Sequence, residues 1–173
     1  MRLPTAHLSA VRLPTAHLSA VRLPTVRLPQ WQLRLAELFA SRWSMPLRWG
    51  THDCCLFAAD AVQACTGHDP AADIRGTYRT QAEAAQVLQR LGGVVEIAIA
   101  RAGPVVRTAH AAAGDIGVIP AGPANPWGPA LVVCGGPHWL AAGTAGLVSH
   151  PTASVLRAWR CTAAPSRAGA GGA

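Results

Sequence analysis

The chain has 173 residues, half of them apolar, which fits one compact domain rather than two. Most of its net charge of +7 comes from an acid-free first segment, and the later arginines are scattered among Asp and Glu, so the basic stripe typical of nucleic-acid binding is missing. No apolar run approaches the roughly 18 residues of a membrane span, and no stretch resembles a secretory signal. We therefore expect a cytoplasmic protein with neither nucleic-acid nor membrane partners.

The first thirty residues are a tandem repeat. Residues 1–10 recur almost unchanged as residues 11–20 and in degraded form as residues 21–30. A ten-residue period with a proline in every copy matches no solenoid unit and prevents a continuous helix. We expect this segment to be disordered, or to lie upstream of the true translation start. Residues 162–173, rich in Ala, Gly, Ser and Pro, are expected to form a disordered tail, which leaves residues 31–161 as the folded domain.

The first half of this domain predicts helices. Residues 31–42 carry apolar side chains at helical spacing. Residues 54–65 form a nearly all-apolar and therefore buried helix, with Asp53 as its N-cap and Gly67 after its end. The run from Thr80 to Glu83 is a capping box that begins a third helix, and residues 94–100 form a short fourth one.

The second half predicts strands, because short apolar runs alternate there with Gly and Pro. The expected strands cover residues 115–119, 130–134, 139–142, 146–149 and 154–160. Helices followed by strands favour an α+β fold, in which the buried helix packs on a small antiparallel sheet of about five strands.

The number and spacing of the cysteines indicate their redox state and whether they bind a metal. Five cysteines without an export signal indicate reduced thiols rather than a disulfide framework. Cys65 and His68 have the C-x-x-H spacing of half a zinc site, but no second pair accompanies them. We expect neither a metal nor a cofactor.

Cys54 is the candidate nucleophile. A thiol in the first turn of a helix lies near unpaired backbone N–H groups and the positive end of the helix dipole, both of which favour the thiolate. The alternative is that Cys54 is a small buried side chain beneath the N-cap. Cys55 points about 100° away on a helix and fits core packing better.

Two resemblances support the first interpretation. The motif Trp49-Gly50-x-x-Asp53-Cys54-x-x-Phe57, followed later by Gly114-Asp115-Ile116-Gly117-Val118-Ile119, resembles the NlpC/P60 family of cysteine peptidases and amidases. The run from Trp49 to Val62, with residues 66–72 and 75–80, more closely resembles an uncharacterised family of phage and prophage proteins, domain of unknown function 6950. The resemblance implies a papain-like fold with Cys54 at the nucleophile position.

The NlpC/P60 resemblance also implies a histidine base at the start of the second strand and a polar residue on the third strand that orients it. This chain has Pro129 or Ala130 at the first position and Ala141 at the second.

Three histidines are candidate replacements for the base. His138, before the strand at 139, is the strongest of them, and His110 and His52 are the others. Asp53 is expected to orient the loop that holds Cys54. The remaining loop residues, Trp49 and Gly50, are expected to shape it and contact a substrate.

The missing base favours a degenerate, non-catalytic protein that serves as a tail-associated or assembly component of a phage-like particle, with tail proteins as partners. The alternative is an active peptidase or amidase of peptidoglycan type, in which Cys54 forms a thioester with a peptide substrate. A further alternative is a small protein-binding module that uses exposed Trp127 and Trp139 as contact residues.

Overall fold

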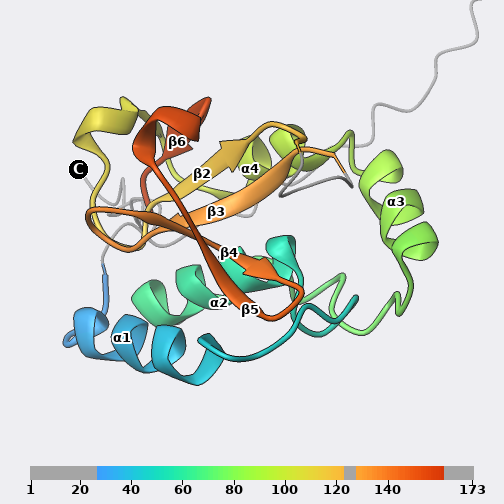
Figure 1. Ribbon diagram of the computed structural model, residues 1–173, viewed down its shortest axis with the longest axis horizontal. Coiled ribbons are helices and arrows are strands. Elements are labelled where there is room, and N and C mark those ends of the chain that lie inside the picture. Colours follow the sequence, from blue (N-terminus) through green and yellow to red (C-terminus); the bar gives the residue numbers. More distant parts are fainter. Residues whose placement is uncertain (1–26, 123–127, 162–173) are drawn as a thin grey trace, which may run out of the picture.

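The computed structural model describes residues 27–122 and 128–161 (Figure 1). Disorder is expected for residues 1–30 and 162–173, and a surface position for Trp127; residues 1–26, residues 162–173 and Trp127 lie outside the described residues. Within the described part of the chain, no helix is long and apolar enough to cross a membrane.

Within residues 27–122 and 128–161, four α-helices form where the sequence predicts them. They are α1 (Trp31–Arg42), α2 (Cys54–Thr66), α3 (Gln81–Arg90) and α4 (Val94–Arg101). The capping signals are also confirmed: Asp53 caps α2, Gly67 ends it with a φ of 77°, and Thr80 and Glu83 form the capping box of α3.

The strands form one antiparallel sheet, which confirms the α+β prediction. In chain order they are β1 (Val105–Val106), β2 (Ile116–Ile119), β3 (Ala130–Cys134), β4 (Trp139–Gly143), β5 (Gly146–His150) and β6 (Arg157–Trp159), and in space they run β1-β6-β2-β3-β4-β5. The sheet has six strands rather than about five, because β1 pairs with β6. A two-residue strand is too short to show an alternating pattern in the sequence.

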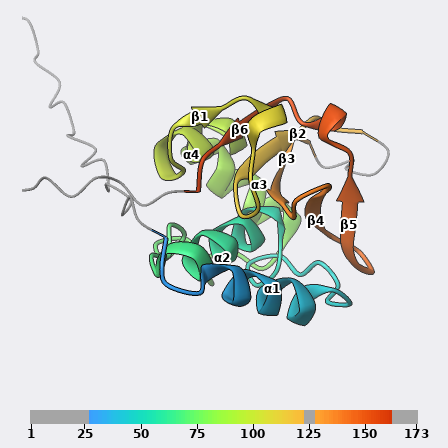
Figure 2. The same ribbon diagram turned by 90° about the vertical axis from the view of Figure 1, so that its left-hand side faces the viewer.

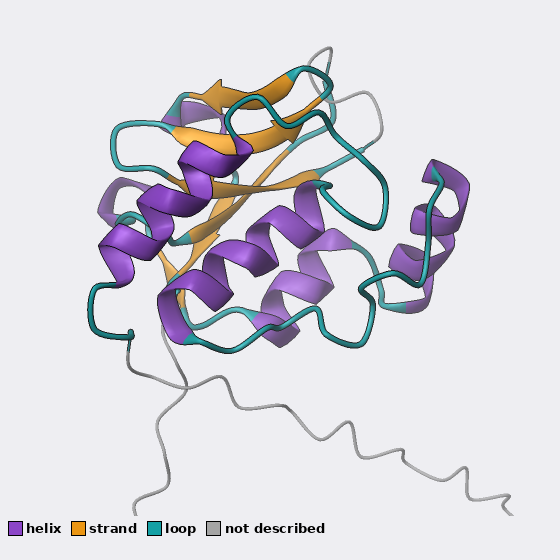
Figure 3. Cartoon of the chain, turned by 90° about the horizontal axis from the view of Figure 1, so that it is seen from below, coloured by secondary structure: helices purple, strands orange, loops and turns teal. Residues whose placement is uncertain are grey.

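Helix α2 lies between the sheet and α1, as Figures 1 and 2 show. Its nearly all-apolar sequence reflects this position, since one side packs on β3 and β4 and another on α1. Helix α3 lies at one end of the molecule (Figures 1 and 3), and its buried residues Ala84 and Val87 belong to the same apolar cluster as Leu56 of α2.

The face of the sheet away from α2 is also apolar. Its core includes Trp139, which is only 1% exposed, so the prediction of an exposed contact tryptophan is wrong. The indole occupies the space above Gly117 on the neighbouring part of the sheet, where a Cβ atom would come within 2.7 Å of it. Trp139 is therefore a core residue and not a docking side chain.

Asp115, which follows Gly114 at the start of β2, holds the two ends of the domain together. Its carboxylate is fully buried and accepts hydrogen bonds from the Arg27 guanidinium (3.0 Å) and the Cys161 amide (2.9 Å), and it pairs with Arg160 at 3.2 Å. Arg27 also stacks on the Trp31 ring at 4.0 Å. The degraded third copy of the repeat thus contributes Arg27 to the packed structure.

Candidate functional site

The loop before α2 is a tight turn closed by its own backbone. The amides and carbonyls of Arg48 and His52 exchange two hydrogen bonds of 2.8 and 2.7 Å across it. Gly50, at a φ of 74°, lies so close to the carbonyl oxygen of Tyr78 that a Cβ atom would meet it at 1.8 Å. Only glycine fits there, which supports the expectation that Gly50 shapes the loop.

Asp53 fixes this loop to the start of α2. Its carboxylate is 2% exposed and accepts hydrogen bonds from the amides of Gly50 (3.0 Å), Cys55 (3.1 Å) and Leu56 (3.1 Å) and from the Tyr78 hydroxyl (2.7 Å). Four bonds use the capacity of a carboxylate, so Asp53 orients the loop and has no lone pair left for proton transfer. Burial and the neighbouring Asp53 charge raise the pKa of Tyr78, which keeps the hydroxyl a donor.

Cys54 is the first residue of α2 and is half-buried. The neighbouring Cys55 side chain has the largest effect on Cys54 and, together with the backbone amides of Leu131 and Cys55, lowers its pKa against the opposing effects of burial and the Asp53 charge. The interaction between the two side chains, and burial, raise the pKa of Cys55. Cys54 is therefore the thiol of the pair that ionises first.

The strand facing Cys54 offers no base. Leu131, whose amide acts on the thiol, is the second residue of β3, so the start of this strand lies near the cysteine. Ala130, the first residue of β3, precedes Leu131 and is buried in the same apolar cluster as Ala141. Cys54 packs against that cluster. Neither alanine can accept a proton, and Pro129 has no titratable group.

His138 and His110 lie at the opposite end of β3. From Leu131 to Cys134 the strand rises about 10 Å, and Cys134 pairs with Trp139, so the exposed His138 lies beyond that far end. His110 precedes β2, whose first residue pairs with Val133 at the same end, and is also exposed. The structure does not bring either histidine to Cys54.

His52 lies two residues from Cys54 in the chain, but its ring packs elsewhere. The imidazole is fully buried and contacts the Phe57 ring edge-on at a centroid distance of 5.8 Å. It also interacts electrostatically with Arg42 and Asp60. Among the described residues, neither ring nitrogen has a hydrogen-bond partner. His52 is thus a buried polar side chain of the core behind the loop.

This burial predicts acid sensitivity. Burial, and then the charge of Arg42, lower the pKa of His52, although Asp60, Asp53 and the Met45 backbone act in the other direction. Below pH about 6.5, where an unfolded histidine titrates, the unfolded chain binds more protons than the folded one, so the free energy of unfolding decreases as the pH falls. The slope from one such group is at most about 1.4 kcal/mol per pH unit.

We expect His52→Phe to flatten the dependence of unfolding free energy on pH between 7 and 5, measured by urea denaturation. Phenylalanine keeps the edge contact with Phe57 and removes the titration. His138→Phe, at an exposed position, is the matched control and should leave the slope unchanged. An unchanged slope in His52→Phe would show that the buried ring is not the acid-sensitive group.

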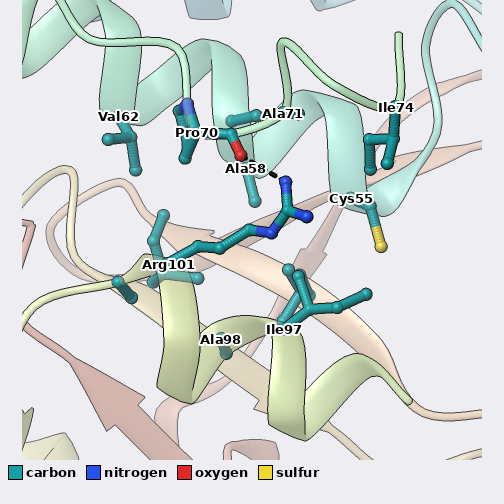
Figure 4. Close-up of a pocket in the computed structure, with 13 residues that line it drawn as sticks. Cys55, Ala58, Val62, Pro70, Ala71, Ile74, Ile97, Ala98 and Arg101 are labelled. Atoms are coloured by element: carbon teal, nitrogen blue, oxygen red, sulfur yellow. Dashed lines mark hydrogen bonds between the residues drawn. The ribbon is translucent and has the colours of Figure 1, made fainter. Parts of the chain in front are cut away.

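Two small cavities flank the cysteine pair. One, of about 20 Å³, is lined by Cys54, Asp53 and Tyr78 among others. The other, of about 30 Å³, lies between α2, α4 and the sheet, with Cys55 on its wall and the Arg101 guanidinium reaching across it to the Pro70 carbonyl (Figure 4). Cavities of this size hold one or two water molecules, so neither accommodates a peptide.

Tyr78 is the site residue that sequence reasoning missed. It lies 25 residues after Asp53 and closes the loop both through its hydroxyl and through the carbonyl above Gly50. The signal was present, since Tyr78 falls in the run 75–80 that carries the resemblance. Among the described residues, no three His, Cys, Asp or Glu side chains gather as a metal site would need.

Comparison with known families identifies one match. The model of a family described as Domain of unknown function (DUF6950) matches residues 26–161. The matched region begins one residue before Arg27 and ends at Cys161. Arg27 and Cys161 both bind Asp115, so the match covers the packed domain from one end to the other. No curated protein matches the chain.

Proposed function

Because the chain belongs to the family described as Domain of unknown function (DUF6950), we propose that it is a non-catalytic relative of the NlpC/P60 hydrolases. In this proposal the papain-like arrangement survives as a structural part, and the protein serves as a tail-associated or assembly component of a phage or prophage particle. The resemblance of residues 49–62, 66–72 and 75–80 to phage and prophage proteins supports the assignment to a particle.

The environment of Cys54 carries the proposal. Amide hydrolysis by a thiolate needs a group that donates a proton to the leaving amine, and a histidine beside the thiol normally does so. Among the described residues, the groups with the largest effects on the Cys54 pKa are Cys55, Asp53 and the Leu131 amide. Asp53 is saturated with hydrogen bonds and the Cys55 pKa is raised, so neither is suited to this proton transfer.

An active cysteine peptidase or amidase is the second candidate function. The lowered pKa of Cys54 at the start of α2 favours it, since a thiolate is the reactive form. In that case the base would come from outside the described residues or from another chain.

The protein composition of purified phage-like particles tests whether the chain is one of their components. We expect particles purified from an induced culture of the source strain to contain the chain at a fixed ratio to the major tail protein, measured by quantitative mass spectrometry. A deletion strain should yield fewer complete tails by electron microscopy, and expression of Cys54→Ala should restore them. Particles that lack the chain and assemble normally without it would overturn the proposal.

A further inference from the structure

A larger hollow lies beside the cysteine loop and shares Trp49 and Tyr78 with the smaller of the two cavities. It measures about 610 Å³, within the range of roughly 300–1,000 Å³ that ligand sites occupy. We call it the Arg48–Arg79 groove. Its walls are Arg48, Trp49, Gly50, Thr51, Gly76, Tyr78 and Arg79.

The groove is cationic. Arg48 and Arg79 are both exposed, and no ion pair between described residues involves either of them, whereas Arg42, Arg75 and Arg101 are each paired with an aspartate. Of the two carboxylates close to these walls in the chain, Asp53 already accepts four hydrogen bonds. Glu83 accepts the backbone amides of Arg79 (2.6 Å) and Thr80 (3.2 Å), and its charge also interacts with that of Arg79.

The groove is also rigid. Gly50 packs on the carbonyl of Tyr78, and Asp53 binds the Tyr78 hydroxyl and the Gly50 amide, so both walls are fixed before any ligand arrives. Trp49, which is half-buried and packs in part against the apolar cluster of Leu56 and Tyr78, also lines the groove. A preformed site loses little entropy when it binds a flexible ligand.

We propose that the Arg48–Arg79 groove binds an acidic peptide segment of a partner protein, with carboxylates at the two guanidinium groups and an apolar side chain on Trp49. Guanidinium groups bind carboxylates through paired hydrogen bonds, and an aromatic wall adds apolar contact area. The inference rests on the proposed function, because it names the class of contact through which an assembly component would hold its partner.

A nucleic acid fits the groove less well. Binding to a phosphate backbone draws on a track of many cations, whereas this groove has two arginines and is flanked by Glu83 on the side of Arg79. Two arginines match two carboxylates of a short peptide.

The test uses the full chain and fluorescein-labelled hexapeptides in which two Glu flank one Leu or Trp at spacings of two, three or four residues, measured by fluorescence anisotropy. The matched peptides carry Gln in place of Glu. We expect at least one Glu peptide to bind with a Kd at least tenfold below that of its Gln counterpart. Binding should weaken as salt increases.

Arg48→Ala and Arg79→Ala should each weaken that binding at least fivefold, while Arg107→Ala and Arg157→Ala, which remove the same charge at exposed positions elsewhere, should not. Equal binding of Glu and Gln peptides, equal effects of all four variants, or no binding by any peptide would overturn the inference. Tighter binding of an eight-nucleotide single strand that depends on the same two arginines would also overturn it.

The two proposals fail separately. The same peptide samples are analysed by mass spectrometry after incubation. Cleavage that disappears in Cys54→Ala would contradict the non-catalytic proposal, whereas intact peptide without arginine-dependent binding would contradict only the docking site.

Discussion

Replacing Gly50 by alanine is expected to cost several kcal/mol of unfolding free energy, more than about 3 kcal/mol. The added Cβ would lie 1.8 Å from the Tyr78 carbonyl oxygen, and a backbone atom cannot move aside as the end of a flexible side chain can. The loop would have to separate from residue 78, which also loosens the Asp53 contacts. Chemical denaturation with far-ultraviolet circular dichroism measures the loss.

Gly76→Ala is the matched control for this clash. Gly76 has a φ of 70°, close to the 74° of Gly50, but nothing lies within 4 Å of the position that its Cβ atom would take. It should cost only about 1 kcal/mol, the ordinary penalty of a left-handed backbone conformation. Equal losses in the two variants would mean that the contact between Gly50 and Tyr78 does not hold the loop.

Asp53→Asn is expected to cost about 3–5 kcal/mol. The amide group can accept through one oxygen only, so at least one of the four donors around the carboxylate loses its partner inside a site that is 2% exposed. The same chemical change at Asp73, whose side chain is 62% exposed, should cost less than about 1 kcal/mol.

A double-mutant cycle tests whether Asp53 and Tyr78 stabilise the loop through the hydrogen bond that they share. Tyr78→Phe removes one donor and should cost about 1–2 kcal/mol, less than Asp53→Asn. Because both residues share one hydrogen bond of 2.7 Å, the loss in the double variant should be clearly smaller than the sum of the two single losses. Additive losses would show that Tyr78 and Asp53 act independently.

The helices and most strands could be predicted because their signals are local. Asp53 and Gly67 mark the ends of α2, and Thr80 with Glu83 marks the start of α3, all within a few residues of the element concerned. The placement of Cys54 in the first turn of a buried helix followed from the same signals. Strand β1 could not be found, because two residues carry no period.

The predictions that were wrong or missing concern contacts between residues distant in the sequence. Trp139 is buried because Gly117, on another strand, leaves space for its ring. Arg27 is ordered by Asp115, 88 residues away, which no local pattern in the repeat indicates. The contact of Tyr78 with Asp53 spans 25 residues, and only the fold brings the two together.

In the candidate site too, local features could be predicted from the sequence and contacts between distant residues could not. The sequence places a thiol at a helix start and an apolar residue at the position where the NlpC/P60 resemblance implies a base, and the fold brings Ala130 and Leu131 of β3 to that thiol. What the sequence could not decide was whether another histidine reaches it. Sheet register places His138 and His110 at the far end of β3, and core packing turns His52 toward Phe57.

The most direct test of the non-catalytic account is Cys54-dependent amide hydrolysis. Purified protein and Cys54→Ala are incubated with soluble peptidoglycan fragments and with unmodified peptides between pH 6 and 9, and the products are quantified by liquid chromatography and mass spectrometry. We predict that wild type and variant give the same background, because none of the described residues beside the thiolate is suited to donate a proton to the leaving amine. Turnover by the wild type that Cys54→Ala abolishes would contradict the account.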